Sequence, residues 1–153
     1  MTADKYENVV RLIELFSRFA KSDWRKQTKW SIKASEVRLL LAIKEGSTHT
    51  DCKGIAVSDI SKILQVTSPT VTQMINNLIR NDYVIRSVHP TDRRMVEISL
   101  TEKGERVAQE ASEMFKRLFE GLIDHLGKER SDQLIELLDQ SLTYFRQTHQ
   151  EKI

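Results

Sequence analysis

The stretch from Val57 to Thr101 constrains the fold more than any other part of the chain. It contains two short helical patterns, followed by two strand-like runs joined by a turn. The first helical pattern has Ser58 in position to act as its N-cap. Its apolar face consists of Ile60, Ile63 and Leu64. A tight polar turn at residues 65–68 then leads to the second predicted helix.

The second helix is expected to have Thr67 or Ser68 as its N-cap and Pro69 in its first turn, where the missing N–H of proline costs nothing. The spacing i, i+3, i+4, i+7 gives it an apolar face, made of Val71, Met74, Ile75 and Leu78. Apart from a proline, the opposite side carries amides, a hydroxyl and one cation. Its residues are Pro69, Thr70, Gln73, Asn76, Asn77 and Arg80. Such groups pair with base edges and phosphates in a major groove, although asparagine and threonine also decorate ordinary solvated helices.

Two strand-like runs follow, at residues 83–88 and 95–100. In the second run, apolar and polar residues alternate with the period of a half-buried strand. The turn-rich segment between them, His-Pro-Thr-Asp-Arg-Arg at residues 89–94, carries two adjacent arginines. Two helices followed by a hairpin with a basic tip predict a winged helix-turn-helix. In that arrangement the second helix enters the major groove, and the arginine tip contacts the backbone or the neighbouring minor groove.

Several residues of this stretch also form a recognisable set. Asp92-Arg93-Arg94 is followed by Val96, Ile98, Leu100 and Thr101. This wing sequence, together with a two-helix core containing Ser58-Asp59-Ile60, Val71-Thr72-Gln73 and Leu78, resembles the MarR (multiple antibiotic resistance regulator) family. Since flanking helices are expected on both sides, the resemblance covers nearly the whole chain.

The resemblance implies a mainly α-helical protein with a small β-hairpin wing. Its winged helix-turn-helix core would span about residues 35–101, with dimerisation helices at about 4–24 and 102–148 in a single domain of residues 1–153. A two-fold dimer would present two recognition helices about 34–36 Å apart to a pseudo-palindromic site in double-stranded DNA. The resemblance further implies a repressor relieved by a signal, and members of the family often bind small phenolic or lipophilic anions. The sequence specifies neither the operator nor an effector.

The candidate DNA-binding residues lie in the second helix and in the wing. In the helix they are Ser68, Thr70, Thr72, Gln73, Asn76 and Asn77. In the wing they are Arg86, Asp92, Arg93 and Arg94. Arg86 is expected to contact a phosphate, and Asp92 is expected to orient an arginine through a salt bridge.

The flanking regions contain more apolar surface than a small DNA-binding module can cover. A helix from Tyr6 to about Ser22 is apolar on more than one face. Two long amphipathic helices, at about 102–126 and 131–147, are separated by Gly127. These patterns predict self-association. Another helix, at 35–45, belongs to the core and is expected to end at Gly46.

The charges are unevenly distributed. Residues 1–106 contain 18 Lys/Arg against 13 Asp/Glu, a net of +5, whereas residues 107–153 contain six against nine, a net of −3. This fits DNA contact by the first part and association by the second. The single cysteine, Cys52, excludes an internal disulfide and suits a reducing compartment. No signal peptide is visible, and no apolar run approaches the roughly 20 residues that span a bilayer, so a cytoplasmic protein is expected.

Other functions are weaker interpretations of the same residues. His49, Asp51 and Cys52 could ligate a metal, but one flexible loop provides neither a fixed geometry nor a clear fourth ligand. A redox role for Cys52 stays open. A metal-dependent repressor similar to the diphtheria-toxin-repressor family would need a ligand cluster around the core helices, which the sequence does not show.

A protein-interaction module that has lost DNA binding is the other alternative. The polar helix face and the Arg93-Arg94 tip both speak against it. An enzyme is not supported, because the sequence shows no nucleophile–base pair, no paired carboxylates and no glycine-rich phosphate loop. No metal or other cofactor is expected.

Overall fold

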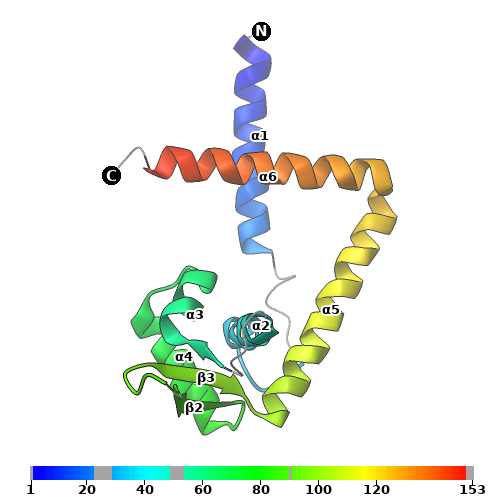
Figure 1. Ribbon diagram of the computed structural model, residues 1–153. Helices are drawn as coiled ribbons and strands as arrows, with labels where there is room; N and C mark the ends of the chain where they lie inside the picture. Colours follow the sequence, from blue (N-terminus) through cyan, green and yellow to red (C-terminus); the bar gives the residue numbers. More distant parts are fainter. Residues whose placement is uncertain (1, 23–28, 49–53, 90, 151–153) are drawn as a thin grey trace. The chain divides into compact units, whose positions relative to one another are not determined.

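The computed structural model describes residues 2–22, 29–48, 54–89 and 91–150 (Figure 1). In chain order the elements are α1 Thr2–Lys21, α2 Ala34–Thr48, β1 Ile55–Ala56, α3 Val57–Leu64, α4 Ser68–Arg80, β2 Val84–Val88, β3 Val96–Leu100, α5 Glu102–Leu126 and α6 Lys128–Gln150. The chain divides into two compact units, Met1–Ala108 and Gln109–Ile153.

The core of the first unit lies between α2, α3, α4 and a small sheet. Its fully buried side chains are Leu39, Leu40, Ile43, Ile60, Val71, Ile75, Leu78, Val84 and Ile98. Burying one such side chain stabilises the fold by about 1.5–3 kcal/mol. The predicted apolar face of α4 is confirmed, because three of its four members are fully buried and Met74 is half-buried.

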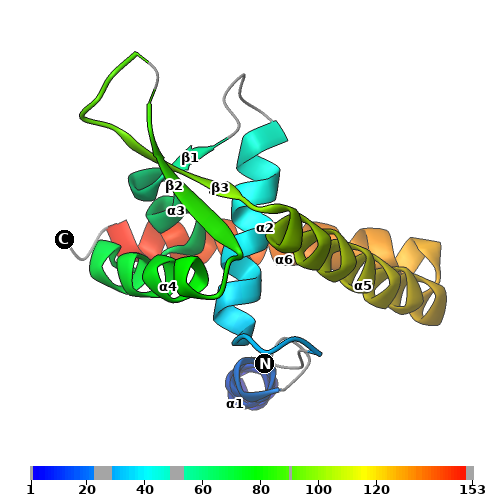
Figure 2. The same ribbon diagram turned by 90° about the horizontal axis from the view of Figure 1, so that it is seen from below.

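The sheet has three antiparallel strands in the order β1-β3-β2 (Figure 2). Strands β2 and β3 form the predicted wing hairpin, in register from Val84 opposite Leu100 to Val88 opposite Val96. Each strand is one residue shorter at its start than the sequence indicates. The sequence does not predict β1, since a strand of two residues is too short to show a period.

Two helix boundaries in this unit differ from the predictions. Ser58 is not the N-cap of α3: the helix begins at Val57, its N-cap position is Ala56, and no side chain caps it. The reason is that Ala56 still belongs to β1, so the chain passes directly from strand to helix. Nor does α2 end at Gly46. A Cβ at that position would lie 2.5 Å from Cδ1 of Ile55, so this glycine lets β1 pack closely against a continuing helix.

A tight joint connects the end of α4 to the start of α5 within the first unit. The hydroxyl of Thr101 donates to the carbonyl of Asp82 at 2.5 Å and accepts from the backbone N–H of Gly104 at 3.0 Å, which makes Thr101 the N-cap of α5. The N–H of Thr101 donates to the carbonyl of Tyr83 at 3.1 Å. Gly104 lies directly against that carbonyl, because a Cβ at Gly104 would be 2.0 Å from the oxygen.

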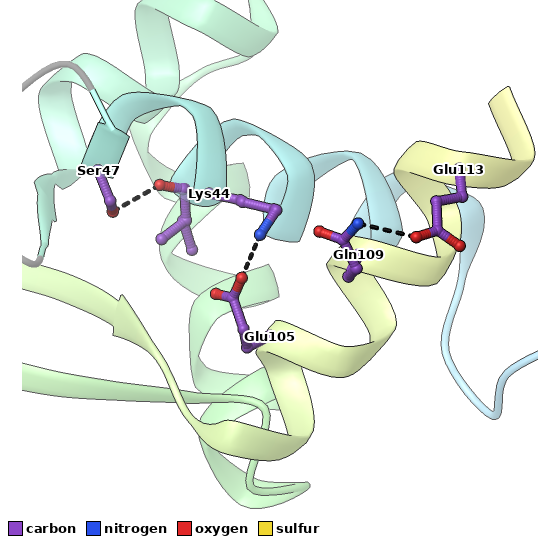
Figure 3. Close-up of polar contacts among 6 residues, drawn as sticks. Lys44, Ser47, Glu105, Gln109 and Glu113 are labelled. Carbon is purple, nitrogen blue, oxygen red and sulfur yellow. Dashed lines mark hydrogen bonds and ion pairs between the residues drawn. The ribbon is translucent and has the colours of Figure 1, made fainter. Parts of the chain in front are cut away.

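An ion pair joins α2 to the first turn of α5 in the same unit. Figure 3 shows the ammonium of Lys44 facing the carboxylate of Glu105. Ser47 donates its hydroxyl back to the carbonyl of Ile43 in the last turn of α2. The ion pair between Lys44 and Glu105 holds the first turn of α5 against the core of the first unit.

The second unit contains the remainder of α5 and all of α6. Gly127 separates the two helices, as predicted, with a left-handed φ of 84°. However, α6 begins at Lys128, before the predicted start at Ser131. The hydrogen bond from Lys128 to the carboxylate of Asp132 raises the pKa of the lysine above its ordinary value. Along α5, the amide of Gln109 donates to Glu113 at 2.9 Å (Figure 3).

Helix α1 is longer than predicted, since it begins at Thr2 and not at Tyr6. Its large apolar side chains are exposed. Within the described ranges, every helix is too short or too polar to cross a membrane. The candidate metal ligands His49, Asp51 and Cys52 lie outside the described residues.

Candidate nucleic-acid interface

The turn between α3 and α4 places α4 on the surface of the first unit. Gln65 ends α3 in a left-handed conformation with a φ of 53°, and the chain then enters α4 through the extended residue Thr67. Thr67 is the N-cap position, as predicted, and Pro69 lies in the first turn. The hydroxyl of Thr67 bonds the hydroxyl of Thr70 at 2.8 Å. The buried face of α4 thus faces the core while its polar residues face outward.

The predicted contact residues in the first two turns of α4 are exposed. They are Ser68, Thr70, Thr72 and Gln73. The hydroxyl of Thr72 donates to the carbonyl of Ser68 at 2.9 Å, which leaves its lone pairs available to accept a hydrogen bond. The amide of Gln73 offers both donors and an acceptor, which suits bidentate pairing with adenine.

Asn76 is exposed in the third turn of α4 and contacts the wing. Arg86, on β2, donates to the amide oxygen of Asn76 at 3.4 Å. The structure therefore places Arg86 beside α4 and away from the wing tip, since it is paired in register with Ile98 of β3. This contact brings a cation to the edge of the predicted groove-reading surface.

Asn77 differs from its neighbours because it is half-buried. Its amide nitrogen donates to the carboxylate of Glu36, at the start of α2, at 2.5 Å. The two residues lie in an open groove of about 570 Å³ beside α4. The groove is lined by Lys33, Ser35, Glu36, Arg38, Leu64, Val66, Thr70, Gln73, Met74, Asn77 and Arg80. Sequence reasoning missed Glu36, whose only local signal is an acidic residue in the first turn of a helix.

At the wing tip, Arg93 and Arg94 are exposed. Among the residues that the structure describes, neither guanidinium has a hydrogen bond or an ion pair. Between Asp92 and the described arginines the predicted salt bridge is not formed: the Asp92 carboxylate accepts the backbone N–H of Arg94 at 3.0 Å. Such a contact between an aspartate and the backbone two residues on is local and stabilises a turn, so Asp92 shapes the tip without occupying an arginine side chain.

His89 holds the other side of the wing turn. Its Nδ1 accepts the backbone N–H groups of Thr91 at 3.2 Å and of Asp92 at 3.3 Å. Its Nε2 lies 3.4 Å from the carboxylate of Glu97. This network fixes the base of the tip while both arginines remain exposed.

The arrangement offers hydrogen-bond donors, acceptors and cations on one unit. In the described part of the chain, no three histidine, cysteine, aspartate or glutamate side chains come together in a way that could hold a metal ion.

A model of the MarR family matches residues 30–95, from just before α2 to the wing turn. Over these residues the chain is similar to the MarR family. An uncharacterized HTH-type transcriptional regulator of Bacillus subtilis (strain 168), YsmB, is 31% identical over 74 residues, which are 46% of this chain and 51% of YsmB. The match thus spans about half the length of that relative.

Two solved structures resemble the chain over nearly its full length. The complex of Staphylococcus aureus MepR with DNA has a TM-score of 0.67 at 24% identity, covering 92% of this chain and 97% of that one. Streptococcus pneumoniae FabT in complex with DNA has a TM-score of 0.62 at 24% identity, covering 100% of both chains. At this identity the likeness concerns the fold. The predicted winged helix-turn-helix fold is therefore confirmed, and the MarR-family relatives are transcriptional regulators, not enzymes.

Proposed function

We propose that this chain is a homodimeric, sequence-specific DNA-binding transcription regulator, with α4 as its recognition helix and the β2–β3 hairpin as its wing. The observation that carries the proposal is the surface of the first unit. An exposed helix face of amides and hydroxyls and two exposed wing arginines belong to one unit, whose core fixes the helix. MepR and FabT, which have the same fold, have been solved in complex with DNA.

The division of labour between helix and wing follows from their chemistry. Ser68, Thr70, Thr72, Gln73 and Asn76 are exposed on α4 and supply groups for base edges and phosphates. Arg93 and Arg94 supply charge for the backbone or the minor groove. Arg86 is close enough to Asn76 to serve a phosphate at the edge of the major groove.

Dimerisation is supported by exposed apolar side chains on the terminal helices. In α6, four residues at helical spacing are at least half exposed: Ile135, Leu138, Leu142 and Phe145. An exposed apolar stripe of this length marks an interaction site. A second copy of the chain is the occupant that would also give two recognition helices for a pseudo-palindromic site. Repression, and its relief by a small molecule or another signal, come from the family resemblance.

The direct test is binding to DNA across a range of salt concentrations. Fragments upstream of the protein's own gene, and sites selected from random double-stranded DNA, would be titrated with the purified protein. We expect sequence-selective binding with a steep salt dependence. A folded dimer that binds every fragment with the same weak affinity would contradict the proposal and favour a protein-interaction module.

Replacing Arg93 and Arg94 together by alanine is expected to weaken binding by about tenfold or more and to reduce the salt slope by about two. The matched control is the double alanine variant of Lys116 and Arg117, which removes the same charge from exposed positions on the second unit. Equal losses in both variants would show that net charge, and not the wing, accounts for the effect.

Replacing Leu138 and Leu142 together by aspartate is expected to convert the dimer into a monomer, because two charges would be buried in an apolar interface. The control variant changes Gln133 and Gln140 to aspartate, on the opposite side of α6. Analytical ultracentrifugation at fixed protein concentration measures the outcome. A dimer that persists in the Leu138→Asp/Leu142→Asp variant would exclude this stripe as the interface.

A further inference from the structure

We propose that Glu36 is a positioning residue for DNA recognition, which holds the recognition helix through Asn77, and that Asn77 anchors α4 instead of reading bases. The inference rests on the DNA-binding function proposed above. The two residues are 41 positions apart in the sequence, one in the first turn of α2 and the other in the last turn but one of α4. Their contact therefore ties the recognition helix to a different part of the core.

Glu36 is built into the protein as a buried acceptor. Glu36 is only 4% exposed, and each of its carboxylate oxygens accepts a hydrogen bond. One accepts from the amide nitrogen of Asn77 at 2.5 Å, and the other accepts from the backbone N–H of Lys33 at 3.1 Å. Burying a carboxylate is unfavourable unless its oxygens accept hydrogen bonds. Losing the hydrogen bond from Asn77 would therefore destabilise the folded protein.

The Lys33 contact anchors Glu36 itself. Lys33 immediately precedes α2, and a glutamate that reaches back to the backbone N–H three residues earlier closes a capping interaction at a helix start. Helix α2 is in turn fixed by fully buried Leu39, Leu40 and Ile43. The carboxylate therefore has a fixed position, and its hydrogen bond from Asn77 holds α4 in place.

This anchor limits a motion that apolar packing alone permits. The buried side of α4 packs through Val71, Ile75 and Leu78, and hydrophobic attraction is not directional. A rotation of α4 by about 20° would move a side-chain tip on its surface by about 2 Å, given the helix radius with side chains of about 5–6 Å. Hydrogen bonds to bases tolerate a spread of only about 0.5 Å, so a directional bond is needed to keep the reading face aligned.

The same contact explains why Asn77 is a poor candidate for base readout. Gln73 and Asn76 are exposed, whereas Asn77 is half-buried with its amide nitrogen directed at Glu36. An asparagine that reads adenine uses its amide nitrogen and oxygen together. At 100° per residue, Asn77 lies on nearly the same side of α4 as Thr70 and Gln73, so it fixes the rotation of the residues that do face the groove.

The test exchanges the donor and the acceptor of the hydrogen bond between Asn77 and Glu36. Asn77→Asp alone sets two carboxylates against each other and is expected to lower selective DNA affinity by about tenfold or more. Adding Glu36→Gln lets the glutamine amide donate to the new aspartate while its oxygen still accepts from Lys33. The double variant has the net charge of the natural protein. We expect it to recover selective affinity to within about threefold of the natural protein.

The matched control moves the aspartate by one residue. Asn76→Asp places the same charge on an exposed position of α4 that does not contact Glu36. It is expected to weaken binding, and Glu36→Gln is expected not to restore it. If Glu36→Gln also fails to restore Asn77→Asp, then Asn77 contacts DNA directly and the positioning role is overturned.

A measurement without DNA separates this inference from the proposed function. Amide hydrogen exchange in α4 of the free protein is expected to rise in Asn77→Asp and to return toward the natural rate in the double variant. If the natural protein shows no selective DNA binding, the proposed function is wrong. The exchange data would still show whether the hydrogen bond between Glu36 and Asn77 holds α4. Unchanged exchange in Asn77→Asp would show that the bond does not hold the helix.

Discussion

Gly104→Ala is expected to lower the free energy of unfolding by about 3 kcal/mol, an effect at the upper end for one added methyl group. The new Cβ would lie 2.0 Å from the carbonyl oxygen of Tyr83 and 3.0 Å from its carbonyl carbon. Both atoms are backbone, and that oxygen also accepts the N–H of Thr101. The clash therefore cannot be relieved by turning a side chain, and α5 must move away from the joint.

The chain provides a control within the same helix. Gly121 is also in α5, but a Cβ there would have no atom within 4 Å. Gly121→Ala is expected to stabilise the protein by about 0.5–1 kcal/mol, because alanine loses less conformational freedom in a helix. Urea unfolding of both variants at one protein concentration gives the comparison. Equal midpoints for Gly104→Ala and the natural protein would show that the joint yields at little cost.

Ile75→Ala is expected to cost about 3 kcal/mol of unfolding free energy and to weaken DNA binding with it. Ile75 is fully buried at the centre of the apolar face of α4. Truncation removes buried methyl and methylene groups and leaves a cavity beneath the recognition helix, which then loses its support.

The control for this variant is Ile63→Ala. Ile63 is the same residue type on the neighbouring helix α3, but it is 52% exposed. Its truncation is expected to change the unfolding free energy by about 1 kcal/mol or less, since little buried surface is lost. Thermal or urea unfolding measures both effects. Similar losses in the two variants would mean that the core does not centre on Ile75.

The periodic parts of the fold were predictable from the sequence. The i, i+3, i+4, i+7 spacing of Val71, Met74, Ile75 and Leu78 locates the buried side of α4, since helical geometry alone puts these residues together. The alternation before Thr101 locates β3, the second strand of the wing, to within one residue. Both features depend only on residues that are close together in the sequence.

The features that were not predictable depend on contacts between distant segments. Strand β1 exists because Ile55 and Ala56 pair with Ile98 and Glu97, and that pairing removes Ser58 from the N-cap position. Gly46 lies inside a helix and leaves room for Ile55, whose Cδ1 would be 2.5 Å from a Cβ at that position. Each of these outcomes is decided by a segment that only folding brings near.

The candidate site divides in the same way. Sequence spacing predicts which residues share the outer side of α4, but it cannot show that Glu36 reaches Asn77. It predicts two arginines at the wing tip but assigns Asp92 a salt bridge, where the fold forms a bond to the backbone. The DNA contacts themselves remain predictions for the experiments described above.

The close approach of Gly104 to the carbonyl of Tyr83 also limits which residues can replace this glycine during evolution. The obstacle at Gly104 is a main-chain atom, so no compensating change at position 83 can make room for a larger residue at position 104. Descendants of this sequence that keep the joint should therefore retain glycine at position 104 whatever aromatic or aliphatic residue replaces Tyr83. Position 121 faces no such obstacle and should drift freely toward alanine and other helix-forming residues.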